Sequence, residues 1–147
     1  MAASVAVGAV VALLALKSPE ASRIGTVGGQ LVAQADLADA LSNRLASKQP
    51  AEGPVQIGLS FKSKVGELCR TFTLKNEGTV GGLACRQGDV WRVQVLASTP
   101  GSAAGGGGYR QAGGNLPPAV LAAMEQEITG EPLDAAAESE ARSKNWN

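Results

Sequence analysis

Residues 67–87, ELCRTFTLKNEGTVGGLACRQ, decide the fold, because two strand-like runs here are separated by a turn. Each run contains β-branched or aromatic residues, and residues 76–78, NEG, between them are typical of a hairpin loop. A three-residue loop of this kind needs a left-handed residue, and Gly78 supplies it. Counting outward from that loop places Cys69 directly opposite Cys85 on the neighbouring strand.

The paired cysteines predict a disulfide. In a non-hydrogen-bonded pair of an antiparallel sheet the Cα atoms lie about 4.5 Å apart, which is within disulfide reach. A bond between Cys69 and Cys85 indicates an oxidising compartment. Two interpretations stay open beside it: a pair of free, buried thiols in a cytosolic sheet, and a strained bond that senses redox state. Two cysteines without any histidine do not make a zinc site.

Two more strand-like runs flank this pair, and the sequence therefore predicts an α+β fold built on a four-stranded antiparallel meander with flanking helices. The four runs are 55–61, 67–75, 79–86 and 90–97. Their short connections allow only antiparallel neighbours. Trp91, on the last run, is expected in the core.

Three helices are expected to pack on the sheet, over 30–47, over 117–129 and from 132 or 134 to about 144. The first has an apolar stripe that needs a partner, either the sheet or a second copy of the chain. Trp146 docks the last helix on the sheet or contacts a second subunit. A homodimer is therefore expected. The candidate interface residues are Leu31, Leu41, Leu45 and Trp146.

The chain begins with an uncharged apolar run, MAASVAVGAVVALLAL, over residues 1–16. It is shorter than the roughly 20 residues that cross a bilayer, and we interpret it as the end of a transmembrane helix. The alternative is a buried core helix. The expected organisation places a connector at 17–29, a domain at 30–147 and a flexible glycine-rich loop at 98–108. We expect the chain to start inside a longer protein.

Composition argues against several functions. The 147 residues carry 13 basic and 13 acidic side chains, so no overall charge attracts nucleic acid. No histidine is present, which excludes histidine-dependent hydrolase triads, and no catalytic, metal or cofactor site is expected. Charged residues are interpreted as surface groups, including the acidic C-terminal residues such as Glu138. Arg70, Arg86 and Arg92 fall on or beside the sheet and are interpreted as surface charges, the alternative being that they line one exposed face for a partner.

Three stretches of the chain resemble a known family: GLSFKSKVGELCRTFTL, GGLACRQGDVWRVQVL and YRQAGGNLPPAVLAAMEQEITGEPLDAAAESEARSKNW. They resemble the extracytoplasmic part of membrane-spanning anti-sigma factors of proteobacteria. The cues are a Cys-Arg strand, a second Cys-Arg strand ending in a turn before a tryptophan, and a tail of the type LPPAVLAAMEQEITGEPLD at residues 116–134. The resemblance covers residues 1 to 146.

This resemblance implies a non-enzymatic regulatory domain in the periplasm, anchored in the inner membrane. A signal received by the domain changes a cytoplasmic segment that sequesters a sigma factor, and that segment is missing from this sequence. The sigma factor and the membrane are the implied partners. The competing hypothesis is a secreted or membrane-anchored module that binds a ligand or protein. An enzyme is the third hypothesis.

Overall fold

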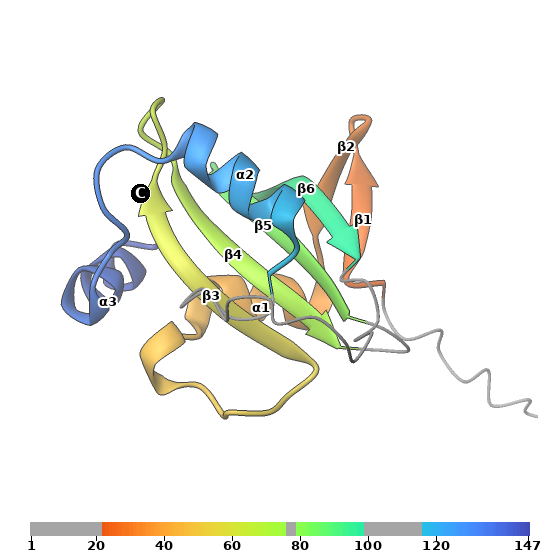
Figure 1. Cartoon of the computed structure of the whole chain (residues 1–147), viewed down its shortest axis with the longest axis horizontal. Helices are drawn as coiled ribbons and strands as arrows, with labels where there is room; N and C mark the ends of the chain where they lie inside the picture. The colour runs from red at the N-terminus through yellow and green to blue at the C-terminus, as the bar shows by residue number, and fades with distance from the viewer. Residues whose placement is uncertain (1–21, 76–78, 99–115) are drawn as a thin grey trace, which may run out of the picture.

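The chain folds as a six-stranded antiparallel sheet with helices on both faces (Figure 1). The computed structural model describes residues 22–75, 79–98 and 116–147. Across the sheet the strands are β1 (Ile24–Val27), β2 (Gln30–Ala33), β6 (Val90–Ser98), β5 (Thr79–Gln87), β4 (Leu68–Lys75) and β3 (Val55–Lys62). The helices are α1 (Ala35–Asn43), a 3-10 turn η1 (Ala46–Lys48), α2 (Pro118–Glu127) and α3 (Ala135–Ser143).

The α+β class and the antiparallel pairing are confirmed. The four predicted strands are β3 to β6, but they belong to a sheet of six strands rather than four. The register between β4 and β5 is the one counted from the sequence, since Cys69 faces Cys85 and Lys75 faces Thr79. The predicted loop at residues 76–78 lies outside the described residues. Both C-terminal helices are also present, and Asp134 caps α3 by accepting a hydrogen bond from the Ala137 amide at 2.8 Å.

The helix predicted over 30–47 is wrong in its first turn, and the sheet gains two strands as a result. Gly28 and Gly29 have φ angles of +59° and +78°, which make a tight turn between β1 and β2. Residues 24–27 were predicted as part of a connector, and they form the edge strand instead. Leu31 therefore lies on β2, and the helix begins only at Ala35.

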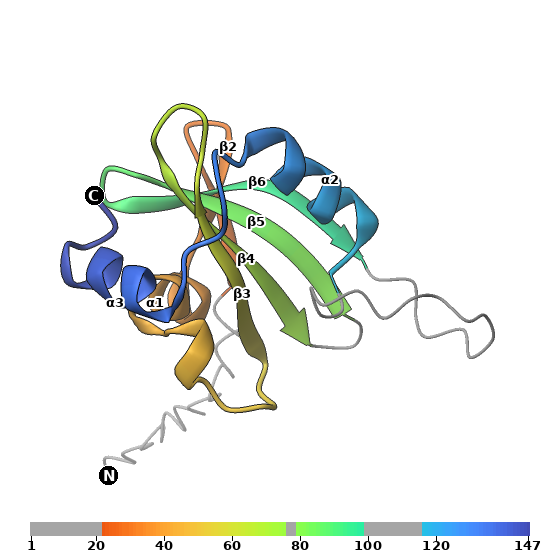
Figure 2. The same cartoon turned by 60° about the vertical axis from the view of Figure 1, so that its left-hand side comes forward.

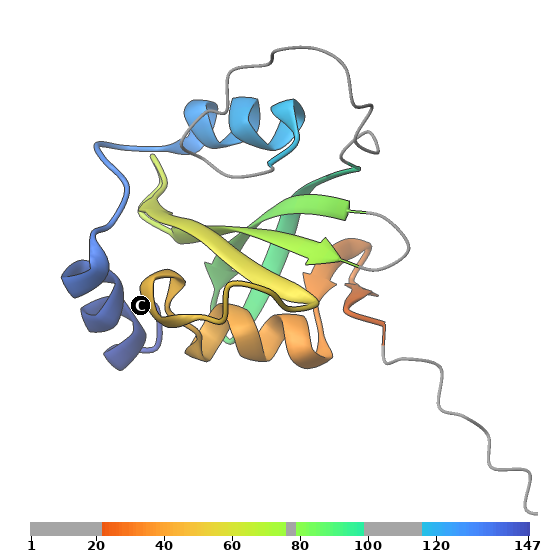
Figure 3. The ribbon, with the colours of Figure 1, turned by 60° about the horizontal axis from the view of Figure 1, so that its bottom comes forward.

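Helices cover the sheet on two sides. Figures 2 and 3 show α1 and α3 beside each other on one face and α2 on the opposite face. The larger apolar cluster lies under α1 and α3 and includes Phe72 and Trp91. The smaller cluster lies under α2 and includes Phe61 and Val120. Consecutive residues of the central strands are therefore both buried, one on each face.

The outer edge of β3 is closed by the rest of the chain. The Gln49 side chain bonds both the amide and the carbonyl of Ile57. Arg44 Nη1 donates to the Val55 carbonyl at 2.7 Å, and the Leu133 amide donates to the Ser60 carbonyl at 2.7 Å. These bonds occupy the backbone groups through which another strand would pair.

Two sequence predictions fall on undescribed parts of the chain. The apolar run at 1–16 lies outside the described residues, as does the glycine-rich loop beyond Ser98. Among the helices that are described, none has the length and apolar character needed to cross a bilayer.

Residue 82 on β5 has to be glycine because the ring of Phe72, its cross-strand partner on β4, occupies the space of a side chain. A Cβ at residue 82 would lie 2.3 Å from the Phe72 ring, which is itself fully buried. We expect Gly82→Ala to lower the free energy of unfolding by about 1–3 kcal/mol, measured by urea denaturation. Gly53→Ala is the control, because its Cβ meets the end of the flexible Gln56 side chain at 3.2 Å and otherwise only the Val55 carbonyl at an ordinary 3.8 Å. Equal stability of the two variants would contradict this packing.

Candidate functional site

The two Cys-Arg pairs of the central strands present their side chains to opposite faces of the sheet. Cys69 and Cys85 pack in the cluster under α2. Arg70 points to the other face, where it reaches the end of α1. Arg86 lies on that same face, with its guanidinium carbon 5.6 Å from the Trp91 ring centroid. A disulfide and a buried arginine cluster therefore lie back to back across the sheet.

The predicted disulfide is confirmed. Cys69 and Cys85 are joined with a Cα–Cα distance of 4.0 Å. Their exposed fractions are 0% and 3%, so the bond is enclosed by the core under α2. It links β4 to β5 at the centre of the sheet and restrains the unfolded chain.

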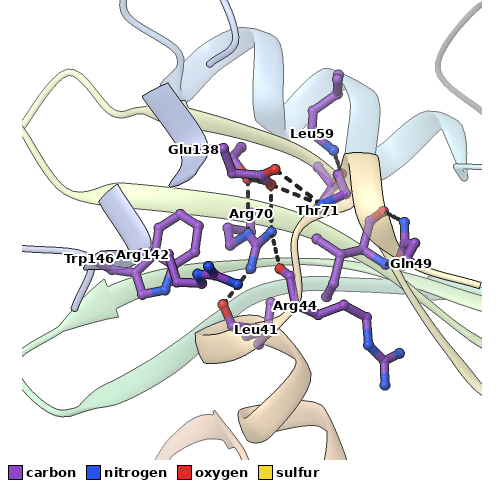
Figure 4. A network of polar contacts seen from close by, with 12 residues as sticks. Leu41, Arg44, Gln49, Leu59, Arg70, Thr71, Glu138, Arg142 and Trp146 are labelled. Carbon is purple, nitrogen blue, oxygen red and sulfur yellow. Dashed lines mark hydrogen bonds and ion pairs between the residues drawn. The ribbon is translucent and has the colours of Figure 1, made fainter. Parts of the chain in front are cut away.

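Arg70 is the centre of a buried polar network (Figure 4). Its exposed fraction is 0%. Its Nε donates to Ser60 Oγ at 2.9 Å, and its Nη1 donates to the Leu41 carbonyl. Its Nη2 donates to the Arg44 carbonyl at 2.8 Å and to Glu138 Oε1 at 2.6 Å. One guanidinium thus joins β3, β4, the end of α1 and α3.

Glu138 completes the network from α3. It is only 3% exposed, so its interpretation as a solvated surface residue is wrong. Its Oε1 accepts a hydrogen bond from Ser60 Oγ at 2.8 Å, and its carboxylate accepts one from the Ala46 amide at 3.1 Å. The carboxylate therefore binds the turn after α1 as well as the guanidinium of Arg70.

Burial dominates the electrostatics of Arg70. Removal from water lowers the pKa of Arg70 from its ordinary value to about 10, although the charge and hydrogen bond of Glu138 act in the opposite direction. The guanidinium still carries its proton at neutral pH. A buried charge of this kind is tolerated only while it is paired and hydrogen-bonded.

Trp146 covers the network from the C-terminal end of α3. Its ring centroid lies 4.2 Å from the Arg70 guanidinium carbon, and it meets Trp91 edge to face at 5.6 Å. Its Nε1 donates to the Ser42 carbonyl at 2.7 Å, while Trp91 Nε1 donates to Ser42 Oγ at 2.9 Å. Trp146 therefore docks the last helix on the α1 face of the sheet. This was one of the two roles predicted for it, the other being contact with a second subunit.

The structure separates the four candidate interface residues. Leu41, Leu45 and Trp146 are 0%, 5% and 2% exposed, because they pack inside their own domain. The proposal that they offer a surface to a second copy is therefore wrong. Leu31 is 42% exposed on β2. The homodimer itself stays a prediction.

The interpretation of Arg70 and Arg86 as surface charges is also wrong, since their exposed fractions are 0% and 8%. Arg92 is partly exposed. A signal was present in the sequence: each buried arginine directly follows a cysteine on a central strand. When helices cover both faces of a sheet, the neighbour of a core residue is buried as well.

Within residues 22–75, 79–98 and 116–147, no group of three or more His, Cys, Asp or Glu side chains is placed to hold a metal ion. Comparisons with protein-family models, curated proteins and solved structures find no match to the chain.

The disulfide is expected to contribute measurably to stability. It closes a loop with a sequence separation of 16, and in the chain-entropy model a loop of this size contributes about 3 kcal/mol. We expect the double variant Cys69→Ala, Cys85→Ala to lose that free energy of unfolding in guanidinium denaturation. The native chain under reducing conditions should approach the double variant. Identical midpoints for the oxidised chain and the double variant would refute this contribution.

The ion pair of Arg70 is tested by comparing two glutamates of α3. Glu138→Gln removes the charge facing a fully buried guanidinium, and we expect a loss of about 3–5 kcal/mol in the free energy of unfolding. Glu140→Gln is the matched control, because the Glu140–Lys144 pair is exposed at 65% and 61%. This control should change thermal unfolding little. Comparable losses in both variants would be inconsistent with a special role for the buried pair.

Proposed function

We propose that the chain is the extracytoplasmic regulatory domain of a membrane-anchored anti-sigma factor. In this proposal the domain lies in the periplasm, the apolar residues 1–16 belong to an inner-membrane span, and the domain acts without catalysis. It relays a signal to a sigma-factor-binding segment outside these 147 residues.

The observation that carries the proposal is the enclosed disulfide between β4 and β5. Disulfides persist in extracytoplasmic compartments and are rare in the reducing cytosol. Cys69 and Cys85 are the two cysteines of the sequence, and they are bonded to each other in the centre of the sheet. This pairing supports an exported domain.

The stretches that carry the resemblance contain the residues that link β4 to β5 and β4 to α3. The two Cys-Arg motifs provide the disulfide and Arg70. Glu138 and Trp146 lie in the third stretch, beyond the LPPAVLAAMEQEITGEPLD tail that ends at Asp134. The resemblance therefore involves residues that act together in the fold, which supports a shared architecture with those anti-sigma factors.

The entry of the chain into the domain provides a route for signal transfer. Arg23 precedes β1 and pairs with Asp36 of α1 at 2.9 Å. The Gln34 amide donates to the Arg23 carbonyl at 2.8 Å. A change in the position of α1 therefore acts on the chain that leads toward the apolar run. Two states of the domain that bind a partner differently are sufficient for regulation.

Topology mapping of the full-length gene product tests the proposal. Reporter fusions or thiol labelling would be placed before residue 1 and after residue 20. We expect a cytoplasmic front, an extracytoplasmic domain after residue 20, and recovery of a sigma factor with the cytoplasmic segment.

Three other outcomes would contradict the proposal, and each points to a different alternative. A chain exported in full favours the competing hypothesis of a secreted or anchored binding module. If the chain stays in the cytosol with both thiols free, the disulfide no longer supports an extracytoplasmic location, and the proposal is wrong. A membrane topology of the expected kind without any sigma factor would leave an anchored module of another function.

A further inference from the structure

An open pocket of about 500 Å³ lies where the end of α1, η1 and α3 meet, beside the Arg70 network. Its volume is typical of sites that bind small molecules or peptide side chains. Three basic residues line it, Arg44, Lys48 and Arg142, and Asp39 is its one acidic lining residue. The pocket therefore has a local positive charge in a chain whose overall charge is zero.

The basic residues of the pocket form no ion pair within the described part of the chain. The ion pairs among the described residues are Arg23–Asp36, Arg70–Glu138 and Lys144–Glu140. None of them includes a basic residue of the pocket. Asp39 accepts a hydrogen bond from the Asn43 side-chain amide at 2.8 Å.

Two of the three cations are already held in place by single bonds. Arg44 Nη1 donates to the Val55 carbonyl at 2.7 Å, and Arg142 Nη1 donates to the Asn43 carbonyl at 3.2 Å. Each guanidinium keeps further N–H groups for an acceptor. Such side chains lose less conformational entropy when they bind a ligand.

The buried network fixes the backbone below the pocket. Arg70 donates to the carbonyls of Leu41 and Arg44, and Arg142 donates to the carbonyl of Asn43. These carbonyl oxygens at the end of α1 are therefore already hydrogen-bonded and do not repel an anion as free acceptors would. Ser139 and Arg142 come from α3, which Glu138 ties to the same turn. Figure 4 shows Arg44 and Arg142 with Arg70 in this network.

We propose that this pocket binds the carboxylate groups of an acidic peptide segment. Guanidinium groups match carboxylates through parallel N–H bonds. The negative charge of Asp39 repels a compact anion with concentrated charge, such as phosphate. Its carboxylate oxygens are acceptors for the amide groups of a peptide. The cations come from the residue after α1, from η1 and from α3, a spread that suits several carboxylates along a chain. The proposal does not depend on regulation of a sigma factor.

An NMR titration of the whole chain tests the proposal, with the peptide acetyl-Gly-Asp-Glu-Asp-Gly-amide as the probe. We expect chemical-shift changes centred on residues 43–48 and 139–142, which decrease as salt increases. Succinate and inorganic phosphate are the comparison ligands. Succinate binding as tightly as the peptide would replace the peptide with a small dicarboxylate, and tighter phosphate binding would overturn the carboxylate assignment.

Three charge-removing variants locate the binding. Lys48→Gln and Arg142→Gln are each expected to weaken peptide binding about tenfold, because each removes one charged donor. Lys48 makes no side-chain bond within the described residues, so its variant should keep the native fold. Lys64→Gln removes the same charge from an exposed site outside the pocket lining and should bind normally. Equal weakening by Lys64→Gln, or no shift with the peptide at low salt, would overturn the proposal.

Discussion

Burial of the Arg70 guanidinium is the constraint that shapes one half of this domain. A charge with 0% exposure needs partners for its donors, and they come from segments far apart in the chain: Ser60, the carbonyls after α1, and Glu138. Because these partners satisfy one group, β3, α1 and α3 have to occupy fixed positions relative to β4. Removing any of them leaves charge or polar groups buried without a bond.

The end of the chain depends on the same group. Asn145 and Trp146 adopt φ angles of +56° and +62°, a conformation that costs side-chain-bearing residues on the order of 1–3 kcal/mol each. Contacts of the Trp146 ring with Arg70 and Trp91 offset this strain. On the opposite face the disulfide holds β4 to β5 independently, so covalent and ionic restraints act on the two sides of one strand pair.

The four strands β3 to β6 and the disulfide were predictable because they follow local rules, whereas β1 and β2 were not predicted. The two runs of β-branched and aromatic residues, separated by three residues, determine the register, and the register determines that Cys69 meets Cys85. The prediction of one helix over 30–47 was wrong because apolar spacing at three and four residues does not distinguish a helix from a short strand followed by a helix. The Gly28–Gly29 pair was the feature of the sequence that indicates the turn between β1 and β2. The Arg70–Glu138 pair was not predictable, since 68 positions separate residues that only the packed fold brings together.

Native-state hydrogen exchange of Arg70→Met, compared with the native chain, tests the central role of this guanidinium most directly. Met keeps an unbranched side chain and removes every donor. If Arg70 holds these elements in place, amides of α3 and of the turn after α1 lose protection together, while amides of β5 and β6 stay protected behind the disulfide. Unchanged protection, or a loss confined to α3, would contradict this role.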